Sequence, residues 1–302
     1  MGADDLGIIR LVTDSIIAVP FIKRTQPEFE FEVLSLHKLF RRNLDYPADR
    51  PHRTQFYQAM LITRGEGTHI VDFETYPYRG RTLIFVAQNQ VQQFVPNLDC
   101  DGILVLFTRS FLYAQTVDGA LLNGHVFNPA LRSPVLHLSE PDYHLFNTLS
   151  SAMQHEYATV HDAFREDIVR NLLRVLLLNA ERLKQVETPL HIHENYDDFT
   201  PFASLVESDF ARTRNVKDYA HALGLSPKTL NRLTGTIVNK PAKAFIDERV
   251  ILEIKRLLAH TELTLKEIAE QTGFDEPTNL VKFFKRHVGR TPMHFRDDLR
   301  SG

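Results

Sequence analysis

The chain has 302 residues, of which 43% are hydrophobic and 24% are charged, so it is large enough for two or three globular domains. Its single cysteine, Cys100, excludes an internal disulfide framework and fits a reducing compartment. No apolar run approaches the ~18–20 residues of a membrane span, and the N-terminus lacks the pattern of an export signal. We therefore expect a cytoplasmic protein with no membrane partner.

The net charge of −3 is distributed unevenly along the chain. Residues 212–302 carry 17 Lys and Arg against 11 Asp and Glu, a net charge of +6. Residues 1–211 carry the other 18 cations and 27 acids, a net charge of −9. Such a division indicates different partners for the two segments, and it makes the basic segment the candidate for binding a polyanion.

Residues ~28–108 alternate apolar and polar side chains with the period of β-strands, as in "QFYQAMLITRGEGTHIVDF" (55–73). Glycine and proline interrupt the pattern often, which indicates short strands joined by turns. Many short strands of this kind predict an antiparallel sandwich or barrel. We assign residues 1–138 to this β-rich domain.

The period becomes helical in residues 139–186. Ser139 is a plausible helix cap, and an early proline and Asp142 follow it. A second, long helix contains "LLRVLLL" (172–178), which is apolar around most of its circumference and therefore needs two apolar neighbours. These neighbours are either two sides of the same domain or that domain and a second subunit. We favour a homodimer, with Leu172, Leu173 and Leu176 as its candidate contacts.

Residues 187–200 are polar, include Pro189 and lack helical periodicity, so we assign them to a linker. Residues 201–302 contain an internal repeat. "VKDYAHALGLSPKTLNRL" (216–233) matches "LKEIAEQTGFDEPTNLVKF" (265–283) at an offset of 49, with one extra residue in the second copy.

Each copy has the pattern of two helices joined by a short turn. Thr264 and Glu267 form a capping-box pattern at the start of one first helix. Gly224 and Gly273 are placed where a helix ends in the left-handed conformation. Helix, glycine-containing turn and helix make the helix-turn-helix motif, whose second helix enters the major groove of DNA.

A third helix lies between the two copies, in "PAKAFIDERVILEIKRLLAHT" (241–261). Twenty helical residues span roughly 30 Å, whereas B-DNA repeats every ~34 Å. A spacer of this length can hold two recognition helices in successive major grooves on one face of the duplex.

Residues ~198–300 resemble the DNA-binding domain of the AraC/XylS family of bacterial transcription regulators, most closely in "IAEQTGFDEPTNLVKFFKRHVGRTPMHFR" (268–296). Leu280 stands where the family usually has phenylalanine, and Lys282 where arginine is common. The resemblance implies six base-reading positions and three phosphate contacts. The base-reading positions are Lys228, Asn231, Arg232, Thr278, Val281 and Lys282, and the phosphate contacts are Lys285, Arg286 and Arg290.

The strand-rich residues ~28–108 resemble the cupin-like sensor domain of the same family, most closely in residues 51–73. Cupin enzymes hold a metal ion with histidines and a carboxylate, and the last histidine follows a Pro–Gly turn. That segment here is Gln88-Asn89-Gln90-Val91-Gln92, and glutamine is a poor ligand for a transition metal. We expect no metal ion, no other cofactor and no enzymatic activity.

The β-rich domain is either a scaffold without a ligand or the holder of a small-molecule pocket, and we favour the pocket. Five residues near its expected strands are candidates for binding an effector: His52, Arg53, Gln55, Tyr57 and His69. Alternation places Arg53, Gln55 and Tyr57 on one face, but it does not decide which face is inward. An inward arginine would favour an organic or aromatic acid as the effector.

The resulting fold is a multidomain α+β chain. An N-terminal antiparallel, cupin-like β-barrel with a helical dimerisation segment precedes a C-terminal, all-α tandem helix-turn-helix. The expected function is sequence-specific transcription regulation, with double-stranded DNA and a small-molecule effector as partners. RNA polymerase is a further candidate partner, as for an activator, although the sequence does not distinguish activation from repression. Two alternatives are a ligand-independent regulator whose N-terminal half only dimerises, and a cupin-type enzyme with a DNA-binding tail.

Overall fold

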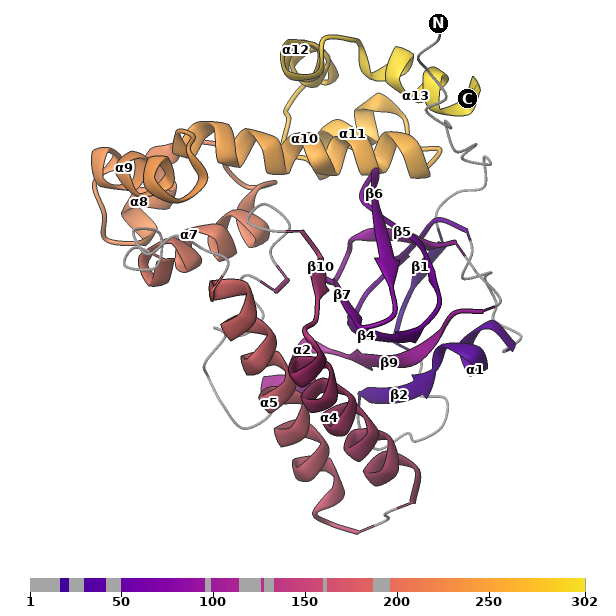
Figure 1. Ribbon diagram of the computed structural model, residues 1–302. Coiled ribbons are helices and arrows are strands. Elements are labelled where there is room, and N and C mark those ends of the chain that lie inside the picture. Colours follow the sequence, from indigo (N-terminus) through magenta and orange to yellow (C-terminus); the bar gives the residue numbers. More distant parts are fainter. Residues whose placement is uncertain are drawn as a thin grey trace, which may run out of the picture. The chain divides into compact units, whose positions relative to one another are not determined.

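The computed structural model describes residues 17–21, 30–41, 50–95, 99–113, 126–127, 133–159, 162–186 and 196–301. These residues form two compact units, one within Ile17–Glu194 and the other within Asn195–Gly302 (Figure 1). The first unit contains strands and helices, whereas the described part of the second contains helices and no strands. None of the helices in the described ranges is long and apolar enough to cross a membrane.

The first unit contains two five-stranded sheets. The first sheet has the order β1-β3-β8-β5-β6, with β1 (Ile17–Val19), β3 (His52–Thr54), β8 (Val91–Phe94), β5 (Glu66–Val71) and β6 (Glu74–Arg79). The second sheet has the order β10-β7-β4-β9-β2, with β10 (Val135–His137), β7 (Thr82–Val86), β4 (Tyr57–Arg64), β9 (Asp101–Phe107) and β2 (Phe31–Ser35). Neighbouring strands are antiparallel except for β1 and β3, which pair in parallel.

The expected closed barrel is wrong for the described strands, because no strand of one sheet pairs with a strand of the other. The two edge strands of the first sheet are poorly suited to pairing with a further strand. At one edge β6 contains Pro77, which has no N–H to offer a further strand, and at the other edge β1 is only three residues long. The alternation of side chains predicts strands, but closure depends on pairing between distant strands, which alternation does not report.

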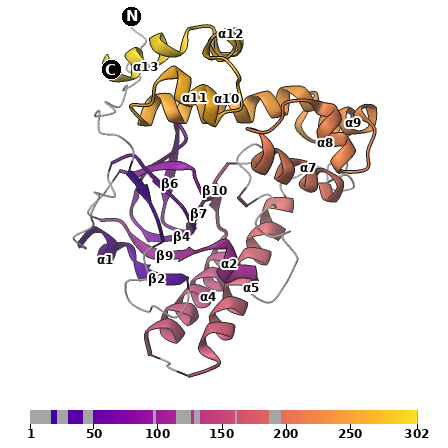
Figure 2. The ribbon, with the colours of Figure 1, turned by 180° about the vertical axis from the view of Figure 1, so that it is seen from behind.

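The second sheet is buried on both faces. Met60, Ile84 and Leu104 belong to a cluster that also includes residues of the first sheet. Ala59, Phe85 and Val105 point the other way, into a cluster with residues of two long helices, α4 (Glu140–Thr159) and α5 (Arg165–Val186). The two helices lie side by side (Figures 1 and 2). The order of layers is therefore sheet, sheet and helix pair.

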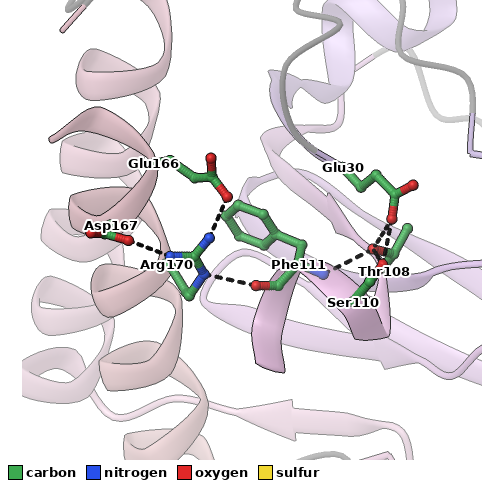
Figure 3. A network of polar contacts seen from close by, with 7 residues as sticks. All are labelled: Glu30, Thr108, Ser110, Phe111, Glu166, Asp167 and Arg170. Carbon is green, nitrogen blue, oxygen red and sulfur yellow. Dashed lines mark hydrogen bonds and ion pairs between the residues drawn. The ribbon is translucent and has the colours of Figure 1, made fainter. Parts of the chain in front are cut away.

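A polar network joins α5 to the second sheet through the short helix α2 (Arg109–Tyr113) (Figure 3). The Arg170 guanidinium donates to the Phe111 carbonyl oxygen at 2.8 Å and also pairs with Glu166 and Asp167. At the other end of α2, the Thr108 hydroxyl accepts from the Phe111 amide at 3.2 Å and donates to Glu30 at 2.7 Å. Another short helix, α1 (Leu36–Arg41), follows β2.

The second unit repeats one structural pattern twice. It begins with α7 (Tyr196–Asp209), and the first pair of helices is α8 (Val216–Ala222) and α9 (Pro227–Val238). A spacer, α10 (Ala242–His260), leads to the second pair, α11 (Leu265–Gln271) and α12 (Pro277–Val288), and then to α13 (Pro292–Ser301). Each first helix has 7 residues and each second helix has 12, so the repeat inferred from the sequence is confirmed.

Helix α7 begins inside the range 187–200 that the sequence assigns to a linker, and residues 187–195 lie outside the described ranges. Pro201 lies within this helix. A proline inside a helix costs about 3 kcal/mol, whereas each buried phenylalanine contributes about 1.5–3 kcal/mol. Phe199 and Phe202 are fully buried, with ring centroids 5.3 and 5.4 Å from that of Phe245. This packing offsets the effect of the proline.

Candidate functional site

Local hydrogen bonds define the two helix-turn-helix units. In the second helix-turn-helix, Thr264 and Glu267 form the expected capping box at the start of α11. In the first helix-turn-helix, the Ser226 hydroxyl accepts from the Thr229 amide at 3.0 Å and starts α9. Gly224 and Gly273 have φ values of +65° and +73°, so both turns use the left-handed conformation predicted for them.

The apolar face of each second helix points into its own unit. Leu230 and Leu233 of α9 are buried, as are their counterparts Leu280 and Phe283 of α12. The small residues expected beneath the crossing helices are also buried; they are Ala220 and Ala269. Because these positions fix the rotation of α9 and α12, the opposite face of each helix is exposed to solvent.

The exposed faces carry most of the expected base-reading residues. Lys228 and Arg232 lie on α9, and Thr278 and Lys282 lie on α12. The three cations in this set form no ion pair with described residues, so they are available to an external anion. The sequence analysis missed Asn279, which is exposed one residue from Thr278 and can recognise adenine. Its place before the buried Leu280 is the signal that could have identified it.

Asn231 is exposed, and both ends of its side-chain amide bond to the backbone of its own domain. Its side-chain oxygen accepts from the Ala242 amide at 3.0 Å, and its side-chain nitrogen donates to the Pro227 carbonyl oxygen at 2.9 Å. Val281, its counterpart in the repeat, packs against the core of the second helix-turn-helix. Both copies therefore engage this position within the domain, and the base-reading role expected for Asn231 and Val281 stays a prediction.

The expected phosphate contacts differ in their surroundings. Lys285 and Arg286 are exposed near the end of α12. Arg290 pairs with Asp298 at 2.5 Å. The corresponding ion pair after the first helix-turn-helix joins Lys240 and Glu248 at 2.6 Å. Because the Arg290 pair is half exposed, a phosphate group could replace its carboxylate at small cost.

The spacer α10 is fixed by contacts with α7, which precedes the first helix-turn-helix, and with α13, which follows the second. Its 19 residues correspond to about 28 Å of helix. Near its middle, Arg249 makes two hydrogen bonds to Glu207 of α7, at 2.6 and 2.8 Å. At its end, the Arg296 guanidinium of α13 donates to the Leu258 carbonyl oxygen at 3.2 Å. Such fixation at several points favours a constant distance between the recognition helices.

A further contact joins the segment before α8 directly to the second turn. The Arg214 guanidinium lies 3.7 Å from the Phe274 ring centroid and donates to the Gly273 carbonyl oxygen at 3.0 Å. Burial lowers the pKa of Arg214, while the nearby carboxylates of Asp247 and Asp275 act in the opposite direction. Because these residues are 59 positions apart, the sequence pattern gave no sign of the contact.

A small pocket lies between the two sheets of the first unit. His52 and His69, both expected near an effector, line it together with Gln58 and Gln92, which the sequence analysis missed. The apolar part of its lining is Leu39, Phe56, Met60, Phe94, Leu104 and Leu106. The cavity has a volume of about 40 Å³, roughly three times what one water molecule needs.

The other three candidates for effector binding lie elsewhere. Tyr57 is buried on the opposite face of the second sheet, where its ring stacks on Phe107 at a centroid distance of 5.6 Å. Gln55 is exposed, and Arg53 does not line the pocket. The side chains that face the pocket are therefore those at the even-numbered positions of this segment, such as His52 and Gln58. The argument for an acidic effector depended on an inward arginine, and it is wrong for this pocket.

The turn that replaces the Pro–Gly turn of cupin enzymes is closed by side chains. The Gln90 side chain accepts from the Ala87 amide at 2.7 Å and donates to Asp72 at 2.9 Å. Gln92 bonds to His69 at 3.1 Å. Among the residues in the described ranges, no three His, Cys, Asp or Glu residues are grouped to hold a metal ion.

The candidate dimer contacts on α5 divide between two faces. Leu173 and Leu176 are fully buried in the core of their own unit, and Leu172 packs against that core. These leucines pack within the protomer, so the expectation that Leu173 and Leu176 contact a partner is corrected. The exposed side of this segment carries Phe164, Ile168, Val175 and Leu178, with 42–70% of each residue accessible.

Known proteins share the pattern of the second unit and much of the whole chain. A family model described as a helix-turn-helix domain matches residues 219–298, from α8 into α13. YfiF of Bacillus subtilis, an uncharacterized HTH-type transcriptional regulator, is 24% identical over 253 residues, covering 81% of this chain and 78% of YfiF. The HTH-type transcriptional activator RhaS of Escherichia coli is 22% identical over 266 residues, covering 84% of this chain and 89% of RhaS.

One solved structure similar to the chain is ToxT of Vibrio cholerae with bound unsaturated fatty acid. It covers 91% of this chain and 97% of ToxT, at 15% identity and a TM-score of 0.41. The family match lies over the two helix-turn-helix units, and the two curated relatives are both named as transcriptional regulators. The chain is a transcriptional regulator with an AraC-type helix-turn-helix DNA-binding domain.

Proposed function

We propose that each protomer binds a two-part DNA site by placing α9 and α12 in successive major grooves. The observation that carries this proposal is the repeated unit on a spacer of about 28 Å, close to the ~34 Å pitch of B-DNA. Exposed, unpaired cations on both recognition helices supply the attraction for phosphate and the means to read guanine.

The two helices would divide the work unequally. On α9, Lys228 and Arg232 are the exposed cations, and Arg232 suits a bidentate contact with guanine. On α12, Lys282 is followed by Lys285 and Arg286, so this helix carries more charge for gripping the backbone. We therefore assign more base discrimination to α9 and more of the salt-dependent affinity to α12.

Selection of DNA from a random library by the full-length protein, followed by hydroxyl-radical footprinting, tests this proposal. We expect two protected segments per protomer, on one face of the duplex and about 10 base pairs apart. Arg232→Ala should weaken protection of one segment and Lys282→Ala that of the other. Protection of a single groove by each protomer would refute the tandem arrangement.

The protein would act as a homodimer through α5. Phe164, Ile168, Val175 and Leu178 follow the alternating three- and four-residue spacing of a heptad seam, with the polar Asn171 between them. Four of the six strongly exposed large apolar residues in the described ranges lie on this seam, which indicates a covered surface. A second copy presents the same seam, and such self-complementarity is what a two-fold interface requires.

Binding of a small molecule in the pocket between the sheets would regulate DNA binding. The pocket combines apolar walls with four buried polar side chains, which is the composition of a ligand site. An effector would act by favouring one arrangement of the dimer over another. The alternative, a ligand-independent regulator, predicts that occupation of this pocket leaves the affinity for the selected DNA unchanged.

A further inference from the structure

One of the residues that line the pocket between the sheets carries a buried polar atom without a partner. His69 is only 1% exposed, and its Nδ1 has no hydrogen-bond partner among the described residues. The other ring nitrogen, Nε2, lies 3.1 Å from Oε1 of Gln92. Leaving a buried acceptor unpaired destabilises a fold, so such an atom on a residue that lines a cavity is a candidate partner for a ligand.

The bonds of the two histidines determine what the pocket presents. Since the Gln92 oxygen only accepts, Nε2 of His69 carries the proton and Nδ1 presents a lone pair. His52 Nδ1 lies 2.8 Å from the Arg50 carbonyl oxygen and donates to it. The acceptor that lacks a partner is therefore Nδ1 of His69.

The pocket is also electrically neutral. Burial lowers the pKa of His69 to about 3 and also lowers the pKa of His52, so both rings are uncharged near neutral pH. No Lys, Arg, Asp or Glu is among the described residues that line the cavity. An ionised carboxylate would lose its hydration there, would meet no cation among the lining residues, and would place its own acceptor oxygens against a further acceptor, Nδ1 of His69.

We infer that this pocket binds an uncharged molecule whose hydroxyl, or similar donor group, donates a hydrogen bond to Nδ1 of His69. Phe56, Met60 and Phe94 would contact the apolar part of the same molecule. The volume of about 40 Å³ fits a small alcohol or the hydroxyl end of a larger ligand. This inference depends on the proposed effector function and replaces the organic acid expected from the sequence with a neutral donor.

Three probes of similar size separate the possible chemistries. Ethanol has a donor, dimethyl ether has only an acceptor, and formate is an anion at pH 7.5. Binding to the full-length protein is measured by calorimetry, and the imidazole nitrogens are followed by ¹⁵N NMR. We expect ethanol to bind at least fivefold more tightly than either other probe and to shift the His69 Nδ1 resonance, because an unmatched polar group is strongly disfavoured in a buried site.

Two variants locate the effect. His69→Phe keeps a ring but removes the acceptor, so it should abolish the preference for the alcohol over the ether. Tyr78→Phe removes a buried hydroxyl from the same core cluster outside the pocket lining, and it should leave the preference unchanged. The probe series and the NMR shift on the unsubstituted protein remain decisive if His69→Phe does not fold.

Each contrary outcome overturns a defined part of the inference. Equal affinities for the alcohol and the ether would exclude donation to His69. Tighter binding of formate would exclude a neutral ligand while leaving the pocket as an effector site. If none of the probes binds, the pocket is not a site for small donors. Two-groove binding of DNA is tested by the footprint and does not depend on any of these results.

Discussion

The two turn glycines occupy equivalent positions in the repeat, but the structure predicts very different costs for replacing them with alanine. Gly224 and Gly273 both have a positive φ, where an L-residue costs about 1–2 kcal/mol. A Cβ at Gly224 would meet no heavy atom within 4 Å. A Cβ at Gly273 would lie 1.8 Å from the Ala211 carbonyl oxygen, so backbone must move.

The movement of Ala211 sets the additional cost. Arg214 follows it by three residues, and displacement would disturb its contact with the Phe274 ring and its hydrogen bond to the Gly273 carbonyl oxygen. A partly buried cation–π contact contributes about 1–2 kcal/mol, and a hydrogen bond contributes about 1 kcal/mol. We therefore expect Gly273→Ala to destabilise the second helix-turn-helix by about 3–5 kcal/mol. Gly224→Ala should destabilise the first helix-turn-helix by only about 1–2 kcal/mol.

Hydrogen exchange followed by mass spectrometry measures this difference locally in the full-length protein. Peptides covering α11 and α12 should lose protection strongly in Gly273→Ala, whereas Gly224→Ala should cause a smaller loss centred on α8 and α9. On selected DNA, Gly273→Ala should also lose the footprint assigned to α12. Equal losses of protection in the two variants would mean that the segment from Ala211 to Arg214 does not contact the second turn in solution.

Four further predictions concern DNA binding and assembly. Asn231→Ala should destabilise the domain by about 1 kcal/mol through the lost bond to the α10 amide without changing base preference; an altered preference at unchanged stability would instead make it a base-reading residue. Arg232→Ala should cost about 1–3 kcal/mol at one base position, and equal weakening on every sequence would make it a phosphate contact. Lys285→Ala should weaken binding to all sequences and reduce the slope of log affinity against log salt, so an unchanged slope excludes a backbone contact. Leu178→Glu should give folded monomers in light scattering, whereas Leu173→Glu should unfold the core; a dimer that survives Leu178→Glu would exclude the α5 seam.

Local signals in the sequence predicted the DNA-binding unit well. The capping box at Thr264, the left-handed glycines and the apolar spacing of the recognition helices each depend on residues within one or two turns of one another. The duplication supplied an independent check, because the same signals occur at the same places in both copies. The structure confirms these elements, including the extra residue in the second turn.

The features that were missed depend on contacts between distant residues. Period-two alternation identified the strands around Tyr57, but both faces of the second sheet are apolar, so alternation could not show that His52 and Gln58 face the pocket. Asn231 has a residue type that suits adenine, and only the position of α10 shows that its amide is engaged internally. The width of the apolar surface on α5 was read correctly, but the inward leucines were assigned to the partner.

The contact at Gly273 also affects how the two recognition helices act together. If the helices were joined only by α10, bending of a single helix would vary their separation, and each would bind largely as an independent module. The contacts of Arg214 form a second connection, from the start of the first helix-turn-helix to the turn of the second helix-turn-helix. Two rigidly connected modules bind a site of matching spacing with a high effective concentration, but the advantage is lost when the spacing is wrong. If α9 and α12 bind successive grooves as we propose, the same connection that raises affinity for a correctly spaced site would also let the protein reject sites whose halves are individually acceptable but separated by the wrong distance.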